Sequence, residues 1–160
     1  MAGLLRSVAA RLGTVIPTPR RPGPAPAQVA RRRQVAALQR RQLAYAPELD
    51  GHADPGEIVW TWVPYEDDPR QGKDRPVLVV GRHSRTLFGL MLSSQDERDG
   101  QRHWLALGAG GWDRSSRRSW VRLDRVLTMR EDSIRREGAV LDRERFDRVA
   151  RALRAGYGWR

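Results

Sequence analysis

The sequence GKDRPVLVV, residues 72–80, decides the fold, because it leads from a charged turn into the apolar run PVLVV at positions 76–80. A strand that is apolar on both faces is covered on both sides, so we expect residues 76–80 at the centre of a sheet. Short runs of β-branched and aromatic residues bounded by turn residues predict further strands. These strands are expected at residues 57–63, 87–93, 103–107, 120–123 and 126–129. Glycines recur in and between the runs, as a small and sharply curved barrel requires.

The end of the chain carries the signals of an α-helix. Asp142 is a good N-cap for a helix that starts at Arg143, and a hydrophobic staple can form between Leu141 and Phe146. One apolar stripe follows at three- and four-residue spacing, made of Phe146, Val149, Ala150 and Leu153. Gly156 is expected to supply the left-handed residue that stops the helix. The sequence therefore predicts a mainly β domain with a C-terminal helix packed on the barrel.

Charge and proline content divide the chain near residue 50. The 160 residues are enough for one compact domain and a tail, and their formal net charge is +11. Residues 1–50 hold nine arginines and a run of closely spaced prolines. We expect residues 1–50 to be a basic Pro/Arg-rich N-terminal extension, disordered or partly helical, and residues 51–160 to be the folded domain. The charge indicates a polyanionic partner. The extension is a solvated arm, holds nucleic acid through phosphate contacts, or packs against the barrel and regulates it.

Several classes of protein are excluded by what the sequence lacks. Cysteine is absent, which excludes disulfide frameworks, thiolate zinc sites and cysteine nucleophiles. No apolar run approaches the roughly 18 residues of a membrane span. Arg6 and Arg11 interrupt the first apolar segment, where the core of a secretory signal would be unbroken. We therefore expect a cytoplasmic protein without a membrane span.

Two catalytic chemistries find only weak support in the residue pattern. The histidines, His52, His83 and His103, can in principle act as an acid and base pair on RNA, but none lies near another in the sequence. The acidic clusters at residues 66–68 and 96–99 can in principle bind Mg²⁺, but both are typical of exposed loops. The sequence therefore predicts no metal and no cofactor.

Basic residues and hydroxyls stand at the ends of two neighbouring predicted strands. Lys73 and Arg75 enter the central strand, whereas Ser93, Ser94 and Gln95 leave the next one. An arginine fork with a hydroxyl and an amide beside it can hold a phosphodiester. The alternative is structural: Arg75 pairs with a nearby aspartate at a strand edge, and the two serines merely end a strand.

Four blocks of sequence, taken in order, resemble MazF/PemK-type toxins of type II toxin-antitoxin systems. They are GEIVW at 56–60, GKDRPVLVV at 72–80, LSSQ at 92–95 and SWVRLDRV at 119–126. The resemblance implies a homodimeric SH3-like β-barrel of the MazF/PemK/CcdB type with peripheral helices. It also implies a metal-independent, sequence-selective endoribonuclease that a cognate antitoxin protein holds inactive. In such enzymes the 2′-hydroxyl of RNA attacks the adjacent phosphorus and leaves 2′,3′-cyclic phosphate and 5′-hydroxyl ends.

The resemblance also assigns site residues. The family's arginine falls on Arg75, which would contact the scissile phosphate, stabilise the transition state and take part in proton transfer. The family's catalytic threonine falls on Ser93, with Ser94 as the alternative if the register shifts by one. Trp112 either stacks on an unpaired base or lies in the core or a dimer interface. The loop at 64–74 overhangs the substrate groove, where its acidic residues would limit or tune RNA binding. The residues expected to bind RNA are Gly72, Lys73, Gln95, Trp112, Arg117 and Arg118.

A noncatalytic SH3-like module that binds nucleic acid or a peptide partner is the alternative function. A fold does not guarantee activity, because function depends on the site. The serine at the family's threonine position and the basic extension both favour this alternative.

Overall fold

The computed structural model describes residues 41–48 and 50–160 of the chain, and it describes no side chains at 136–138. The expected conformation of residues 1–40 therefore lies outside the described residues. Within the described part of the chain, no helix is both long enough and apolar enough to cross a membrane.

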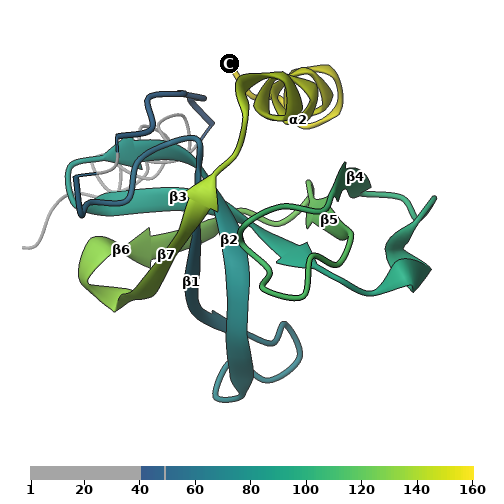
Figure 1. Ribbon diagram of the computed structural model, residues 1–160, viewed down its shortest axis with the longest axis horizontal. Helices are drawn as coiled ribbons and strands as arrows, with labels where there is room; N and C mark the ends of the chain where they lie inside the picture. Colours follow the sequence, from purple (N-terminus) through teal and green to yellow (C-terminus); the bar gives the residue numbers. More distant parts are fainter. Residues whose placement is uncertain (1–40, 49) are drawn as a thin grey trace, which may run out of the picture.

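The described chain forms a strongly curved antiparallel sheet with one α-helix beside it (Figure 1). The strand order is β4-β5-β3-β2-β1-β7, and β6 also pairs with β3. The strands are β1 (Glu57–Pro64), β2 (Gly72–His83), β3 (Thr86–Ser93), β4 (Trp104–Gly108), β5 (Ser119–Arg122), β6 (Leu127–Arg130) and β7 (Ile134–Val140). Two short 3-10 helices, η1 (Asp96–Arg98) and η2 (Glu131–Ser133), and the helix α2 (Arg143–Gly156) complete the fold. The predicted SH3-like β-barrel with a C-terminal helix is confirmed, whereas β7 is a strand that the sequence pattern did not predict.

Strand β2 lies between β1 and β3, as its apolar run predicted. Val77 and Val79 point into one cluster of buried residues, and Leu78 and Val80 point into the other. All four of these side chains are fully buried. Because alternate residues of a strand face opposite sides of the sheet, burial of both sides requires the continuous apolar run.

Helix α2 begins as predicted but ends differently. The Asp142 side chain accepts a hydrogen bond from the Arg145 N–H at 2.9 Å, and Leu141 and Phe146 are buried on either side of this cap. The prediction that Gly156 is the left-handed stop is wrong, because Gly156 is the last helical residue and the positive φ of 67° belongs to Gly158. The later turn brings Trp159 into the core.

Residues 41–48 run along the barrel, although the sequence placed them in the N-terminal extension. Leu43 N–H donates to the Arg160 carbonyl at 2.9 Å, and Ala44 N–H donates to the Val80 carbonyl at 3.0 Å. The Tyr45 hydroxyl donates to the Leu141 carbonyl at 3.0 Å. We call residues 41–48 the strap, because they tie the start of the described chain to β2 and to the C-terminus.

Candidate functional site

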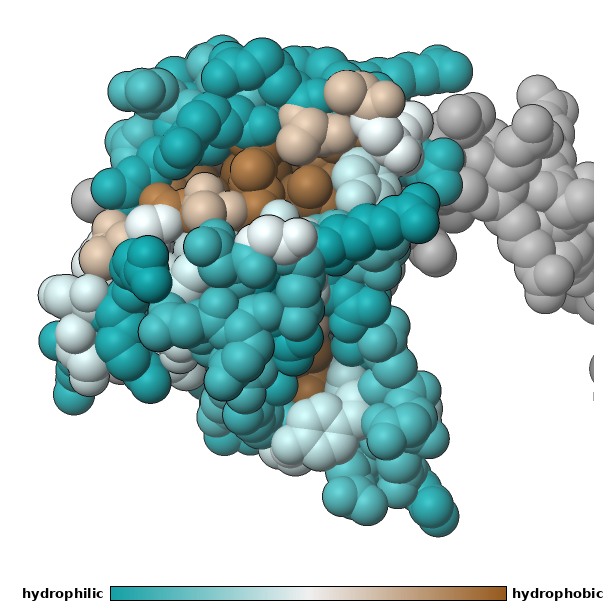
Figure 2. Space-filling model, turned by 90° about the vertical axis from the view of Figure 1, so that its right-hand side faces the viewer, coloured by the Kyte–Doolittle hydropathy of each residue, from teal (hydrophilic) through white to brown (hydrophobic). Residues whose placement is uncertain are grey.

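Arg75 stands between two hollows on the surface of the barrel. Its strand, β2, pairs with β1 so that Arg75 lies opposite Thr61, and Pro76 follows it directly. Arg75 lines both a hollow of about 280 Å³ and a second one of about 470 Å³. The part of the molecule that carries β4 and β5 is mostly hydrophilic, with apolar side chains in a recessed band (Figure 2). We call the smaller cavity the serine hollow and the larger one the arginine hollow, after the side chains that line them.

The serine hollow brings together five of the residues predicted for the site. They are Lys73, Arg75, Ser93, Ser94 and Arg117. Four of them meet because β2 and β3 are antiparallel neighbours, which places the start of β2 beside the end of β3. Arg117 comes from the segment that leads into β5. With Ser119 and two aspartates, Asp74 and Asp113, the lining of the hollow holds three cationic side chains, three hydroxyls and two carboxylates. Asp113 pairs with Arg117 at 2.9 Å.

The two serines differ in exposure and in hydrogen bonding. Ser93 is only 4% exposed, and its Oγ accepts a hydrogen bond from the Gln95 N–H at 3.3 Å. Ser94, the next residue, is half-buried at the rim. Since the Ser93 oxygen acts as an acceptor, its hydroxyl proton stays available for donation into the hollow.

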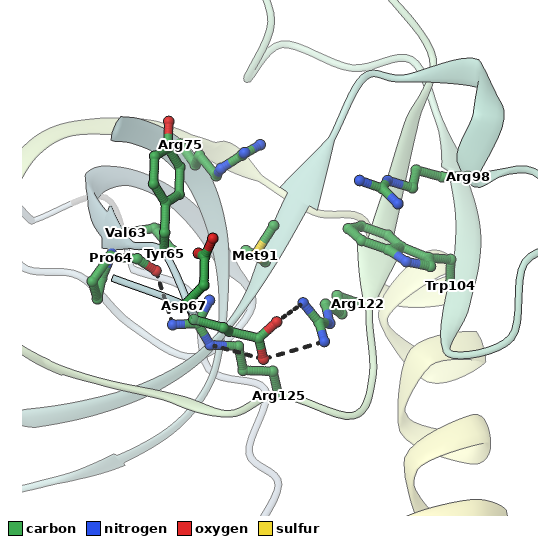
Figure 3. A pocket seen from close by; sticks show the side chains of 11 residues that line it. Val63, Pro64, Tyr65, Asp67, Arg75, Met91, Arg98, Trp104, Arg122 and Arg125 are labelled. Carbon is green, nitrogen blue, oxygen red and sulfur yellow. Dashed lines mark hydrogen bonds and ion pairs between the residues drawn. The ribbon is translucent and has the colours of Figure 1, made fainter. Parts of the chain in front are cut away.

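The arginine hollow is lined by four arginines, two aromatic rings and two carboxylates, among other residues. The charged and aromatic members are Arg75, Arg98, Arg122, Arg125, Tyr65, Trp104, Glu66 and Asp67. Figure 3 shows Tyr65 and Arg75 on one side of it and Arg98 with Trp104 on the other. The Arg98 guanidinium lies 4.8 Å from the centre of the Trp104 ring, which is a cation–π contact.

The cations of the arginine hollow influence one another. Burial is the main cause that lowers the pKa of Arg75; Tyr65 opposes this shift, and the nearby charges of Arg98 and Arg125 add to it. A guanidinium still remains protonated near neutral pH, so Arg75 keeps its charge. Hydrogen bonds that Arg122 donates to the carboxylates of Asp124 and Glu66 raise the pKa of Arg122. These arginines are therefore permanent cations that face a shared space.

Four residues predicted to bind RNA do not line the serine hollow, and Trp112 is the clearest case. Trp112 is 2% exposed, belongs to the core and donates its Nε1–H to Ser119 Oγ at 3.0 Å. Of the two alternatives for Trp112 the structure therefore supports the core position, because a side chain so buried has no free face for a base.

Gly72, also predicted to bind RNA, has a structural role. A Cβ at Gly72 would collide with the Val63 carbonyl oxygen, so this glycine permits the close approach of β1 and β2.

Gln95 and Arg118 lie beside the serine hollow without lining it. Gln95 Oε1 accepts a hydrogen bond from Arg98 Nη2 at 3.2 Å. Arg118 pairs with Asp96 at 3.4 Å and lies over the Trp120 ring. Both residues are exposed on the surface of the molecule.

Sequence reasoning missed most of the arginine hollow. Arg98, Trp104, Arg122 and Arg125 come from η1, from β4 and from the end of β5 with the turn after it. One usable signal was present, since Arg122 and Arg125 stand at the end of a predicted strand, where side chains reach the edge of a sheet. The position of Arg98 and Trp104 opposite Arg75 depends on the tertiary fold.

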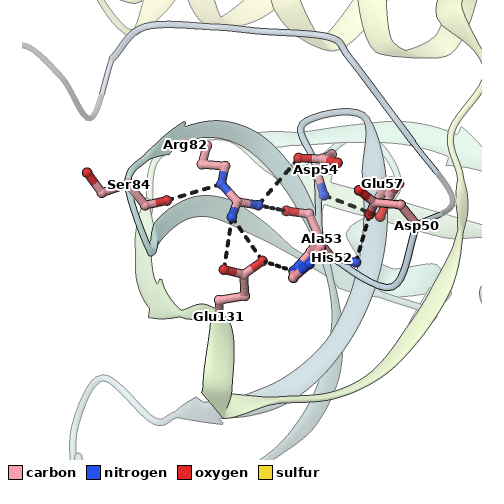
Figure 4. Close-up of polar contacts among 8 residues, drawn as sticks. All are labelled: Asp50, His52, Ala53, Asp54, Glu57, Arg82, Ser84 and Glu131. Carbon is pink, nitrogen blue, oxygen red and sulfur yellow. Dashed lines mark hydrogen bonds and ion pairs between the residues drawn. The ribbon is translucent and has the colours of Figure 1, made fainter.

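The structure does not support a histidine acid–base pair or a Mg²⁺ site, the two weaker possibilities in the sequence. His52 contacts Glu131 at 3.1 Å in a network that centres on Arg82 (Figure 4), and His103 contacts Tyr157 at 2.7 Å. Neither histidine lines the serine or the arginine hollow. Among residues 41–48 and 50–160, no group of three His, Asp or Glu side chains is placed to hold a metal ion.

Comparison with known proteins agrees with this fold. Residues 54–156 match the family described as PemK-like, MazF-like toxin of type II toxin-antitoxin system. No curated protein matches the sequence.

Solved structures share the fold at low sequence identity. An endoribonuclease in complex with its cognate antitoxin from a mycobacterial species is 16% identical, with a TM-score of 0.50 over 68% of this chain and 96% of the other. MazE–MazF from Deinococcus radiodurans is 21% identical, with a TM-score of 0.51 over 72% of this chain and 98% of the other. A second crystal form of that complex gives 18% identity and a TM-score of 0.50, over 68% of this chain and 98% of the other.

Proposed function

Because the chain belongs to the family of PemK-like, MazF-like toxins of type II toxin-antitoxin systems, we propose that it is a sequence-selective endoribonuclease that needs no metal. Its substrate is single-stranded RNA, and its products carry 2′,3′-cyclic phosphate and 5′-hydroxyl ends. A cognate antitoxin holds it inactive, and it acts as a homodimer. The observation that carries the proposal is the position of Arg75 beside the buried hydroxyl of Ser93, at the junction of two hollows with other arginines around them.

The chemistry requires an anion-stabilising site rather than a metal. The 2′-oxygen loses its proton and bonds to phosphorus, the bond from phosphorus to the 5′-oxygen breaks, and the 5′-oxygen takes up a proton. Negative charge grows on the non-bridging phosphate oxygens in between. Fixed donors aimed at that charge lower the barrier, and losing one such donor typically reduces the rate about 10²- to 10³-fold. We assign this role to the guanidinium of Arg75 and to the hydroxyl of Ser93.

Arg75 is suited to this role because it lies on a central strand, at the junction of the two hollows, and stays charged. Its side chain is partly buried in β2, next to the rigid ring of Pro76. Its planar fork can donate two parallel hydrogen bonds to phosphate oxygens. The lowered pKa favours proton release but leaves the guanidinium protonated near neutral pH, so we assign charge stabilisation to Arg75 ahead of proton transfer.

Cleavage of a long natural RNA in excess EDTA tests the proposal. We expect discrete cuts with cyclic phosphate ends for the parent chain, and a loss of at least about 10²-fold in rate for Arg75→Ala, with RNA affinity largely kept. Arg85→Ala is the matched control, because it removes the same charge from the turn at the other end of β2. Equal cleavage by Arg75→Ala and the parent would refute the role of Arg75. Binding without any cleavage by the parent would instead favour the noncatalytic module.

A further inference from the structure

A carboxylate of the chain itself lies inside the arginine hollow. Glu66 follows β1 in the loop that leads to β2, and Arg122 holds its two oxygens at 2.8 and 3.3 Å. Arg125 Nε approaches the same carboxylate at 3.8 Å, and Arg125 Nη2 donates to the Pro64 carbonyl at 2.9 Å. The loop therefore places an anion where the guanidiniums of Arg122 and Arg125, labelled in Figure 3, converge.

The cations are fixed more firmly than the anion that they hold. The side chains of Arg122 and Arg125 are each 21% exposed, whereas that of Glu66 is 54% exposed. Arg122 is anchored independently by Asp124 at 2.7 Å, and Arg125 by its bond to the Pro64 carbonyl. Both anchors can persist if Glu66 leaves, so the two arginines form a preformed anion site with a replaceable occupant.

The position of this site indicates which anion it accepts. The hollow shares Arg75 with the serine hollow, so a chain whose phosphate lies at Arg75 continues directly into it. Four arginines line the hollow against Glu66 and Asp67, and Asp124 pairs with Arg122 from beside it, so the net charge stays positive even while Glu66 is in place. Two guanidiniums that grip a carboxylate have the donor geometry that also grips a phosphate.

We propose that Arg122 and Arg125 form a second phosphate subsite for single-stranded RNA, next to the phosphate at Arg75, and that the Glu66 carboxylate fills this subsite until RNA displaces it. The choice of RNA rests on the proposed function. Glu66 then acts as an internal competitor that weakens RNA binding without taking part in the reaction.

The test measures RNA affinity separately from cleavage. The probe is a fluorescent, mixed-sequence oligonucleotide of about 12 nucleotides in which every 2′-hydroxyl is methylated, so the proposed 2′-oxygen attack cannot occur. The full chain is compared with Glu66→Gln and with Glu97→Gln. Glu97 is the matched control because it lies in η1 next to Arg98 and does not line the arginine hollow.

We expect Glu66→Gln to bind the probe about threefold to fivefold more tightly at moderate salt, the scale of one released surface ion pair. The plot of log affinity against log salt should steepen by up to about 0.7, because in the parent the displaced Glu66 carboxylate offsets the counterion released by one phosphate contact, and glutamine does not. Adding Arg122→Gln to Glu66→Gln should remove the gain. Arg125→Gln replaces Arg122→Gln in this step if thermal melting shows that the latter fails to fold.

Three results would overturn the subsite. They are no gain for Glu66→Gln, an equal gain for Glu97→Gln, or a gain toward a polyglutamate peptide but not toward the oligonucleotide. A gain confined to Glu66→Gln, in a chain that cleaves no RNA, would keep the subsite and refute the proposed function. If the chain cleaves RNA, Glu66→Gln should lower KM by a larger factor than any change in kcat.

Discussion

Ser93 and Ser94 are neighbours in sequence, yet the structure gives their hydroxyls different surroundings. Ser93 is buried at the end of β3, and the Gln95 N–H orients its oxygen. Ser94 lies at the rim, and its partly exposed side chain has more rotational freedom. A donor that stabilises a transition state acts through a fixed position, because no reorganisation is then needed during the reaction.

We therefore predict that Ser93→Ala lowers the single-turnover rate of RNA cleavage about 10²-fold, whereas Ser94→Ala changes it by less than about threefold. Ser93→Thr is the informative control, because it keeps the hydroxyl and restricts its rotamers. It should retain most of the activity. A large loss for Ser94→Ala with little loss for Ser93→Ala would transfer the role to Ser94.

At the scale of single elements, α2 depends on a local signal at its N-cap, Asp142. The Asp142 carboxylate accepts the Arg145 N–H at 2.9 Å and also contacts the Arg145 side chain at 3.2 Å. An N-cap of this kind satisfies one of the backbone donors that the first turn leaves unpaired. The helix then buries Phe146, Val149 and Leu153 against the barrel.

We predict that Asp142→Ala lowers the free energy of unfolding by about 1 kcal/mol. Arg148→Ala, an exposed position within the same helix, should change it by less than about 0.5 kcal/mol. Urea denaturation of both variants at neutral pH checks the difference. Equal losses for the two variants would show that the cap contributes no more than an ordinary surface residue of α2.

Strands with a strong local pattern could be predicted from the sequence, and β7 could not. The run at 76–80 is apolar without interruption, so its central position follows from its own residues. Strand β7 reads IRREGAV, with charge in its middle and no regular alternation. It pairs with β1 through two register shifts, so its existence depends on the neighbouring strand rather than on its own pattern.

The candidate site likewise contains one part that could be predicted from the sequence and one that could not. The serine hollow could be predicted, because adjacent antiparallel strands bring the start of β2 and the end of β3 together. Trp112 shows the limit of this reasoning, since an aromatic residue in a basic, glycine-rich stretch is typical of both a base platform and a core residue. Arg98 and Trp104 face Arg75 only because of how η1 and β4 fold back, which no local pattern records.

At the scale of the whole molecule, the strap changes where we place the start of the folded unit. Ala46 N–H donates to the Pro55 carbonyl at 2.8 Å, in addition to the strap's bonds to β2 and to the C-terminus. The Tyr45 ring lies 4.9 Å from the ring of Phe146, between centres. A Cβ at Gly56 would lie 2.8 Å from that tyrosine ring, so the barrel leaves room for the strap. We propose that the folded unit begins near residue 41, ahead of the matched family region that begins at 54.

Two truncations test this boundary. Removing residues 1–40 leaves every described contact of the strap in place, so we expect a melting temperature close to that of the full chain. Removing residues 1–50 deletes the strap's backbone hydrogen bonds and exposes apolar surface beneath Leu43 and Tyr45. At about 1 kcal/mol per hydrogen bond and about 25 cal/mol per Å² of apolar surface, we expect a loss of about 2–4 kcal/mol. For a domain of this size that loss lowers the melting temperature by about 10 °C.

Tyr45→Ala in the full chain separates the packing of the strap from the effect of shortening the chain. It removes the ring contact with Phe146 and the hydrogen bond to the Leu141 carbonyl, while the backbone of the strap remains. We expect its melting temperature to lie between those of the two truncated chains, because part of the strap's contribution to stability survives. Calorimetric melting of all four proteins under one set of conditions measures the order. If the chain that begins at residue 51 has the same melting temperature as the chain that begins at residue 41, the strap adds no stability and the folded unit begins at residue 51.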